Sequence, residues 1–155
     1  MEPSSLADGA ADQAARLALG VASPASIVSW ADERIAELPR PPIELIELSL
    51  SAVNGADVLE LLERLAAGAG PGAVRPALSE FGRQVGDGTI GLRDAMSRLD
   101  EFARRRADGV GTDVRDFLSW AYDDYDLIED GYVDRTYDQL RADLEALLRR
   151  SAGEE

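Results

Sequence analysis

The stretch SPASIVSWADERIAELPRPPIELIELSL, residues 23–50, carries the clearest structural pattern in the chain. Ser23 belongs to the residue types that cap helix N-termini, and Pro24 suits the first helical position. Apolar residues then recur at helical spacing, at Ile27, Trp30, Ala31, Ile35 and Leu38. This half of the stretch therefore predicts a helix with one apolar face.

Three prolines, at positions 39, 41 and 42, end this predicted helix, because proline lacks an N–H donor and restricts the residue before it. A second helix is expected to begin at Pro42 or Ile43. Its apolar face is predicted to carry Ile43, Ile46, Leu50 and Val53. The stretch as a whole therefore predicts a helical hairpin with a rigid corner, which the pair Asn54-Gly55 closes.

The rest of the chain shows the same helical spacing, interrupted by glycine-rich breaks. Asp57 and Thr112 are residue types suited to cap two of the helices. Beyond the hairpin, helices are expected near 12–21, 57–65, 76–85, 92–103, 112–125 and 140–148. Since no stretch alternates apolar and polar residues in the manner of a strand, we predict an all-α fold, a compact bundle of about seven short helices arranged as helical hairpins.

The length of 155 residues suits one domain with a single core, so we expect residues 1–155 to form a single helical domain. The small, polar residues 1–10 and the last residues, 151–155, are expected to fray. No apolar run approaches the length of a membrane span, and the N-terminus lacks the basic and apolar parts of a signal peptide. The sequence therefore predicts a cytoplasmic protein.

The composition excludes much enzyme chemistry, because the chain has no cysteine, no histidine and no lysine, and all 16 basic residues are arginine. Thiolate nucleophiles, histidine general bases, Schiff bases and zinc sites built on cysteine or histidine are therefore absent. The formal net charge of −14 disfavours nucleic acid and anionic membranes as partners. Three explanations of the acidity remain open: solubility, a basic protein partner, or a bound metal.

The densest charge lies at 123–138, DDYDLIEDGYVDRTYD, and all four tyrosines of the chain lie in or beside it. Tyrosine offers a large contact area with a polar tip, and carboxylates steer a basic partner toward a surface. The alternative is a solvated helix end whose tyrosines pack inward. The candidate partner-binding residues are Tyr122, Asp123, Asp124, Tyr125, Asp126, Glu129, Asp130 and Tyr132. This segment does not fit a calcium-binding EF-hand loop, because Ile128 and Tyr137 fall where oxygen ligands are required.

A catalytic alternative depends on two pairs of glutamates, Glu44-x-x-Glu47 and Glu60-x-x-Glu63. Residues three apart share a helix face, and two such helices side by side can hold Mg²⁺ against a phosphate chain. The pattern resembles that of the all-α nucleotide pyrophosphohydrolases of the MazG type, although Glu63 stands where that family has aspartate. The alternative explanation is that these glutamates stabilise a helix N-terminus or are solvated.

Both tryptophans of the chain occur in the same context, Ser29-Trp30-Ala31 and Ser119-Trp120-Ala121. Each triplet lies on a predicted amphipathic helix that is followed by a break and another helix. A remote duplication and a shared packing role for tryptophan both explain this similarity.

A broader resemblance involves Trp30-Ala31-Asp32, the Pro41-Pro42 corner and Leu45 to Leu50. These features resemble those of small helical bacterial proteins of the toxin-immunity type. The resemblance implies a non-enzymatic, cytoplasmic protein that binds a toxin domain, and the acidity of the chain suits a basic partner. No cofactor is expected. It assigns no functional residues, because such families share no common site. A self-associating helical scaffold is a third possibility.

Overall fold

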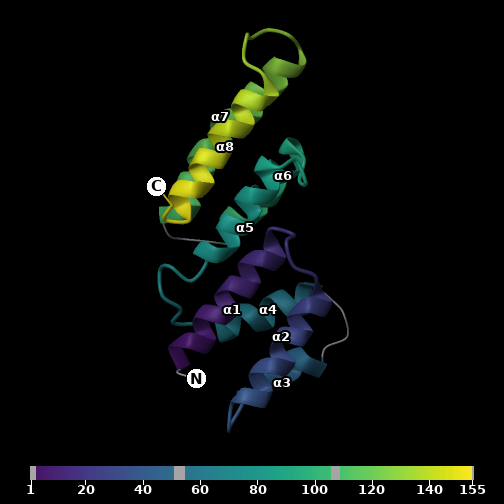
Figure 1. Ribbon diagram of the computed structural model, residues 1–155, viewed down its shortest axis with the longest axis vertical. Coiled ribbons are helices and arrows are strands. Elements are labelled where there is room, and N and C mark those ends of the chain that lie inside the picture. The colour runs from purple at the N-terminus through teal and green to yellow at the C-terminus, as the bar shows by residue number, and fades with distance from the viewer. Residues whose placement is uncertain (1–2, 51–54, 106–108, 155) are drawn as a thin grey trace. The chain divides into compact units, whose positions relative to one another are not determined.

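The computed structural model describes residues 3–50, 55–105 and 109–154, and every regular element in these ranges is a helix (Figure 1). Eight helices are present there, against about seven expected. The prediction of an all-α fold is therefore confirmed. The chain divides into two compact units, Met1–Ala77 and Leu78–Glu155, and each is described by itself. The expected single domain over 1–155 stays a prediction.

The first unit contains α1 (Pro3–Ala18), α2 (Pro24–Glu37), α3 (Ile43–Leu50) and α4 (Gly55–Leu65). Helix α3 packs against both α2 and α4, and α1 packs against α4. Apolar side chains from all four helices form one core, made of Leu6, Ala10, Ile27, Ala31, Leu45, Leu48, Val58, Leu61 and Leu62. The predicted hairpin of α2 and α3 is thus present and forms one side of this core.

Helix α2 begins as its sequence predicts, because Ser23 and Ser26 form a reciprocal capping box with Pro24 in the first turn. Its end at Glu37, followed by Leu38 in extended conformation, agrees with the proline run. Helix α4 begins at Gly55, so this glycine does not close the hairpin as expected. The other expected closing residue, Asn54, lies outside the described residues.

The predicted apolar face of α3 is wrong. Leu45 and Leu48 are fully buried, whereas Ile43 is 62% exposed and Leu50 is 79% exposed. Ile46 is half-buried, and Val53 lies outside the described residues. Because α3 is apolar on two sides, helical spacing alone could not decide which side faces α2 and α4.

The expected fraying of residues 1–10 also differs from the structure, because α1 begins at Pro3. Leu6, Ala7 and Ala10 are buried. Small residues let α1 approach its neighbours closely, and a Cβ atom at Gly9 would lie 3.2 Å from the ring of Trp30. The first turns of α1 are therefore part of the core of the first unit.

The second unit contains most of α5 (Arg75–Gly86), together with α6 (Leu92–Arg104), α7 (Gly109–Glu129) and α8 (Tyr137–Ser151). Helix α7 packs against both α6 and α8. The predicted apolar positions of α6 and α8 are all buried, namely Leu92, Ala95, Met96, Leu99, Phe102, Ala103, Leu140, Leu144, Leu147 and Leu148. Helix α7 begins at Gly109, before the predicted cap at Thr112.

The turn between α7 and α8 has defined caps on both sides. Gly131, with φ +78°, follows α7, and its N–H donates to the Ile128 carbonyl at 3.1 Å. The Tyr132 N–H donates to the Leu127 carbonyl at 2.9 Å, which completes a Schellman motif. Thr136 then forms a capping box with Gln139 at the start of α8. These caps fix the position of Tyr132 beside the end of α7.

The expected fraying of residues 151–155 is not seen in the described part, which ends at residue 154. Ser151 belongs to α8, and Ala152 is buried. The backbone N–H groups of Ala152 and Glu154 donate to the carbonyls of Leu148 and Arg149 at 2.9 and 2.8 Å. These bonds satisfy carbonyls that the end of a helix otherwise leaves unpaired.

Candidate functional site

The eight candidate binding residues lie at the C-terminal end of α7 and in the turn that follows it. Tyr122, Asp124 and Tyr125 are half-buried. The other five are exposed, namely Asp123, Asp126, Glu129, Asp130 and Tyr132. The segment thus places most of its carboxylates in solvent, while two of its tyrosines pack partly inward.

One side of this segment is occupied by Arg93 of α6. Its Nη1 atom lies 3.3 Å from Asp126 Oδ1, and its guanidinium carbon lies 5.8 Å and 5.1 Å from the ring centroids of Tyr122 and Tyr125. Cations are attracted to the faces of aromatic rings at such distances. An arginine of the chain itself therefore already contacts this part of the predicted binding surface.

A second arginine, Arg135, occupies the side that faces α8. Its Nε lies 3.0 Å from Asp124 Oδ2, outside hydrogen-bonding geometry, and its Nη2 atom donates to Asp143. Its guanidinium carbon lies 5.7 Å from the ring of Trp120. The hydrogen bond to Asp143 raises the pKa of Arg135, so this guanidinium stays charged.

Two tyrosines of the segment have raised pKa values. Burial, followed by the nearby charge of Asp100, raises the pKa of Tyr122 above 10.0. Burial also raises the pKa of Tyr137, with added contributions from Glu129, the Tyr125 side chain and Asp130. The rings of Tyr125 and Tyr137 lie 4.9 Å apart. Both raised values describe neutral hydroxyls in an acidic environment, not a group prepared for proton transfer.

A stripe of exposed residues remains along α7. Trp120, Asp123 and Leu127 share a helix face by their spacing of three and four residues, and the Schellman motif brings Tyr132 back beside Leu127. The exposed fractions of Trp120, Leu127 and Tyr132 are 41%, 39% and 78%. We call these four residues the α7 stripe. Trp120 and Leu127 are not among the residues predicted from the sequence, although their helical spacing from Asp123 is a usable signal.

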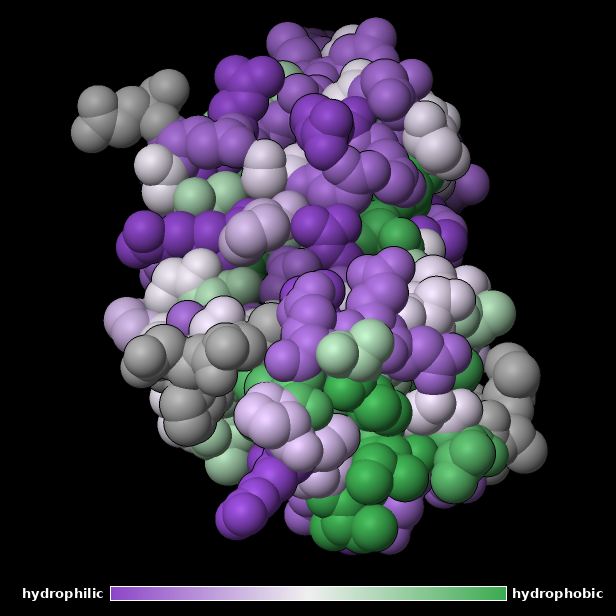
Figure 2. All heavy atoms as spheres, turned by 60° about the horizontal axis from the view of Figure 1, so that its bottom comes forward, coloured by the Kyte–Doolittle hydropathy of each residue, from purple (hydrophilic) through white to green (hydrophobic). Residues whose placement is uncertain are grey.

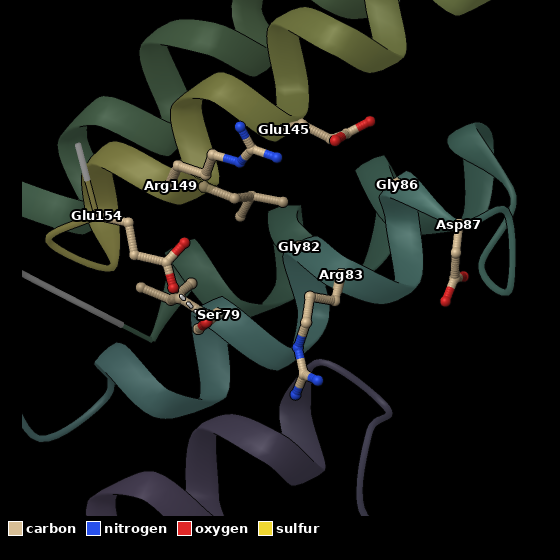
Figure 3. Close-up of a pocket in the computed structure, with 10 residues that line it drawn as sticks. Ser79, Gly82, Arg83, Gly86, Asp87, Glu145, Arg149 and Glu154 are labelled. Carbon is tan, nitrogen blue, oxygen red and sulfur yellow. Dashed lines mark hydrogen bonds between the residues drawn. The ribbon is translucent and has the colours of Figure 1, made fainter.

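A groove of about 390 Å³ lies between α5 and α8, where Gly82 and Gly86 leave space beside α8 (Figure 3). A Cβ atom at Gly86 would lie 2.8 Å from Glu145 Oε2, so this carboxylate lies over the glycine. Ser79 donates to Glu154 across the groove at 2.5 Å. In Figure 3, Arg83 and Asp87 point away from α8. The charged groups of this groove therefore do not converge on one point where a substrate could react.

The glutamates of the catalytic alternative do not come together into a metal site. Glu60 lies 2.7 Å from Arg64 on its own helix, and Glu47 is exposed. Within the ranges that the structure describes, no group of three or more acidic side chains could hold a metal ion. The observed geometry gives the pyrophosphohydrolase alternative no support.

A second apolar patch lies on the outer side of α3, where Ile43 and Leu50 are exposed. Figure 2 looks toward this end of the first unit and shows hydrophobic side chains gathered beside hydrophilic ones. Glu47 lies on the same helix face by its spacing from Ile43 and Leu50. The helical spacing of α3 predicts Ile43 and Leu50 on its apolar face, so their exposure is a correction.

No protein-family model, no curated protein and no solved structure matches the chain. None of the described helices combines the length and apolar character that crossing a bilayer requires. The properties of the surfaces described above are therefore the basis for a functional proposal.

Proposed function

We propose that this chain is a non-enzymatic protein-interaction module that binds a basic partner protein through the α7 stripe. Its most concrete form is an acidic inhibitor of the immunity or antitoxin type, which acts in the bacterial cytoplasm and occludes a cationic site of a toxin domain. The proposed site comprises the α7 stripe with the exposed carboxylates Glu129 and Asp130.

One observation carries this proposal. Among the described residues, six large hydrophobic side chains are exposed, and four of them lie within positions 120–137. Exposed aromatic residues grouped in this way are typical of binding surfaces, because each removes a large apolar area from water when a partner covers it. A helix end that contacts only solvent does not require so many exposed large hydrophobic side chains in one segment.

The charge of the segment indicates the kind of partner. Asp123, Glu129 and Asp130 are exposed around the stripe, and the whole chain has a net charge of −14. Such a field accelerates the approach of a basic protein and repels nucleic acid and anionic membranes. Because Arg93 and Arg135 already pair with Asp126 and Asp124, we assign the steering of the partner to Asp123, Glu129 and Asp130.

The test is affinity capture from a lysate of the native host, at low and at high salt, with three forms of the protein. These are the unsubstituted chain, a stripe variant (Leu127→Ser with Tyr132→Ser) and a control variant (Ile43→Ser with Leu50→Ser). The control removes the same number of exposed apolar side chains from α3. We expect the unsubstituted chain and the control to capture a basic protein that salt releases, and the stripe variant to lose it.

Equal capture by all three forms would contradict the assignment of the surface. No captured protein at either salt would argue against a high-affinity inhibitor. A triple substitution, Asp123→Asn, Glu129→Gln and Asp130→Asn, should slow association with the captured protein and reduce its salt dependence, while the helical content stays unchanged.

Self-association through α3 is a second candidate function, favoured by the exposure of Ile43 and Leu50 on one short helix. Sedimentation of the unsubstituted chain and of the α3 control variant tests it. A dimer that the Ile43→Ser and Leu50→Ser substitutions dissociate would support this function, and a monomer in both cases would exclude it at the concentrations used.

A further inference from the structure

A groove of about 550 Å³ runs beside Trp120, between α7 and the C-terminal half of α8. Its walls combine aromatic, acidic and aliphatic groups from the two helices, which pack against each other. The lining residues are Asp113, Asp116, Phe117, Trp120, Leu147, Arg150 and Ser151.

The ring of Trp120 forms an aromatic surface in this groove. It meets the ring of Phe117 edge to face, with centroids 4.7 Å apart and an angle of 64° between the planes. Phe117 and Leu147 are buried and hold this wall in place, while Trp120 remains 41% exposed. An exposed indole is the aromatic face that binds a cation best.

The charges around the ring are arranged asymmetrically. Asp113 and Asp116 are exposed, lie one helical turn apart, and line the groove on the α7 side. Arg150, also exposed, lines the α8 side. Two carboxylates against one guanidinium leave an excess negative charge at the groove, which adds to the negative field of the whole chain.

The chain itself provides an example of the interaction that this ring supports. The guanidinium of Arg135 lies 5.7 Å from the Trp120 ring while the same side chain pairs with Asp124 and Asp143. An indole, two carboxylates and a guanidinium thus already form one cluster at Trp120. The groove offers an indole and two carboxylates, Asp113 and Asp116, to a guanidinium from outside.

We infer that this groove binds an arginine side chain of the basic partner, with its guanidinium against Trp120 and paired with Asp113 and Asp116. The inference rests on the proposed function and specifies which side chain the partner supplies. Arginine fits better than lysine, because its planar group stacks on aromatic rings, pairs with carboxylates through two donors and is more weakly hydrated.

The probe for this inference is a blocked glycine–arginine pentapeptide, compared with the same peptide carrying citrulline, the neutral counterpart of arginine. The protein carries Trp30→Phe, so that Trp120 is the only source of tryptophan fluorescence. We expect saturable quenching by the arginine peptide and at least about fivefold weaker binding of the citrulline peptide, since the charge carries both cation–π and ion-pair attraction. Calorimetry on the unsubstituted chain provides a second readout that does not depend on Trp30→Phe.

Variants on the two sides of the groove give opposite expectations. Asp113→Asn with Asp116→Asn should weaken binding of the arginine peptide by about threefold or more. Arg150→Gln should strengthen binding by a similar factor, because this substitution removes a positive charge that repels the arginine of the peptide. The pair Glu33→Gln and Glu37→Gln on α2 removes the same charge in the first unit and should have no such effect. Equal affinity for the two peptides, or binding insensitive to Asp113 and Asp116, would overturn the inference.

The outcomes separate this inference from the proposed function. If the stripe variant loses the captured partner while the unsubstituted chain does not bind the arginine peptide, the groove inference fails and the proposed function stands. If the peptide binds as expected but the stripe variant, Leu127→Ser with Tyr132→Ser, still captures the partner, the groove is a cation site and the proposed interaction surface is wrong.

Discussion

At the scale of single residues, the two tryptophans show how little a local motif decides about environment. Trp30 is half-buried beside Gly9 of α1, where even one added carbon would lie 3.2 Å from its ring. Trp120 is 41% exposed and borders a groove. The alanine that follows is fully buried in both cases. The shared Ser-Trp-Ala triplet therefore places the alanine in the core but leaves the role of the tryptophan to its neighbours.

Tyr122 should make the stability of the fold depend on alkaline pH. Its pKa is raised in the folded state by burial and by Asp100, so the folded chain holds the hydroxyl proton more tightly than the unfolded chain does. The stabilisation is fully present below pH 10.0 and is lost as pH rises through the folded pKa. Urea unfolding of the Tyr122→Phe variant should show a weaker loss of stability above this pH. Tyr132→Phe, with an exposed ring, is the control, and identical pH profiles for both variants would argue against this role of Tyr122.

Gly131, in the turn after α7, should be costly to replace with alanine. Its φ of +78° suits glycine, and no atom lies within 4 Å of an added Cβ, so the cost is confined to the backbone. Gly131→Ala should lower the free energy of unfolding by about 1–2 kcal/mol. Gly72→Ala is the control, because the φ of Gly72 is not positive and an added Cβ would make only ordinary contacts, at 3.6 Å, with the flexible Arg75 side chain, so the change should stay within about 0.5 kcal/mol. Equal effects of the two substitutions in urea unfolding would show that backbone conformation does not explain the cost.

At the scale of the element, α3 shows where periodicity is insufficient. Its eight residues, IELIELSL, contain apolar side chains on both sides of the helix, and the packing against α2 and α4 selects Leu45 and Leu48. The sequence had favoured the side that bears Ile43 and Leu50. Longer helices with one clear apolar face, such as α6 and α8, have the buried positions that their spacing predicted.

The corrected face of α3 predicts that two leucine substitutions change the free energy of unfolding by very different amounts. Leu45→Ala should lower the free energy of unfolding by about 2–5 kcal/mol, because it opens a cavity in a fully buried site. Leu50→Ala should change it by no more than about 0.5 kcal/mol, since Leu50 is 79% exposed. Both values come from urea unfolding followed by circular dichroism. A larger effect at Leu50 than at Leu45 would restore the face that the sequence analysis expected.

At the scale of the whole molecule, the division into two units predicts how the chain unfolds. Each unit carries buried apolar residues of its own, and Trp30 and Trp120 lie in different units. Trp120→Phe therefore leaves Trp30 as the fluorescent reporter of the first unit, and Trp30→Phe leaves Trp120 as the reporter of the second unit. In these backgrounds Leu45→Ala should shift the transition seen by Trp30, and Leu144→Ala that seen by Trp120, each leaving the other nearly unchanged. A single transition shifted by both substitutions would favour the single domain that the sequence analysis predicts.

The candidate site shows the same limit of sequence reasoning. The acidic and tyrosine-rich composition of 123–138 is a property of the sequence, and it located the segment on which the proposal depends. The partner of Asp126 comes from a distant position, Arg93 of α6, and Asp143 of α8 pairs with the Arg135 that contacts Asp124. Such contacts depend on which helices meet, so local sequence does not show which of the eight candidates have an arginine partner.

The sequence by itself determined the helical class, most helix boundaries and the buried faces of the strongly amphipathic helices, because capping residues, prolines and a 3.6-residue period act locally. It also determined the acidity and the absence of cysteine, histidine and lysine chemistry. Only the tertiary structure decided which side of α3 is buried, which tyrosines contact arginines, and that Trp120 stands beside a groove with Asp113 and Asp116. These features arise where separate helices pack together, and such packing follows from the fit of whole surfaces, which no local pattern encodes.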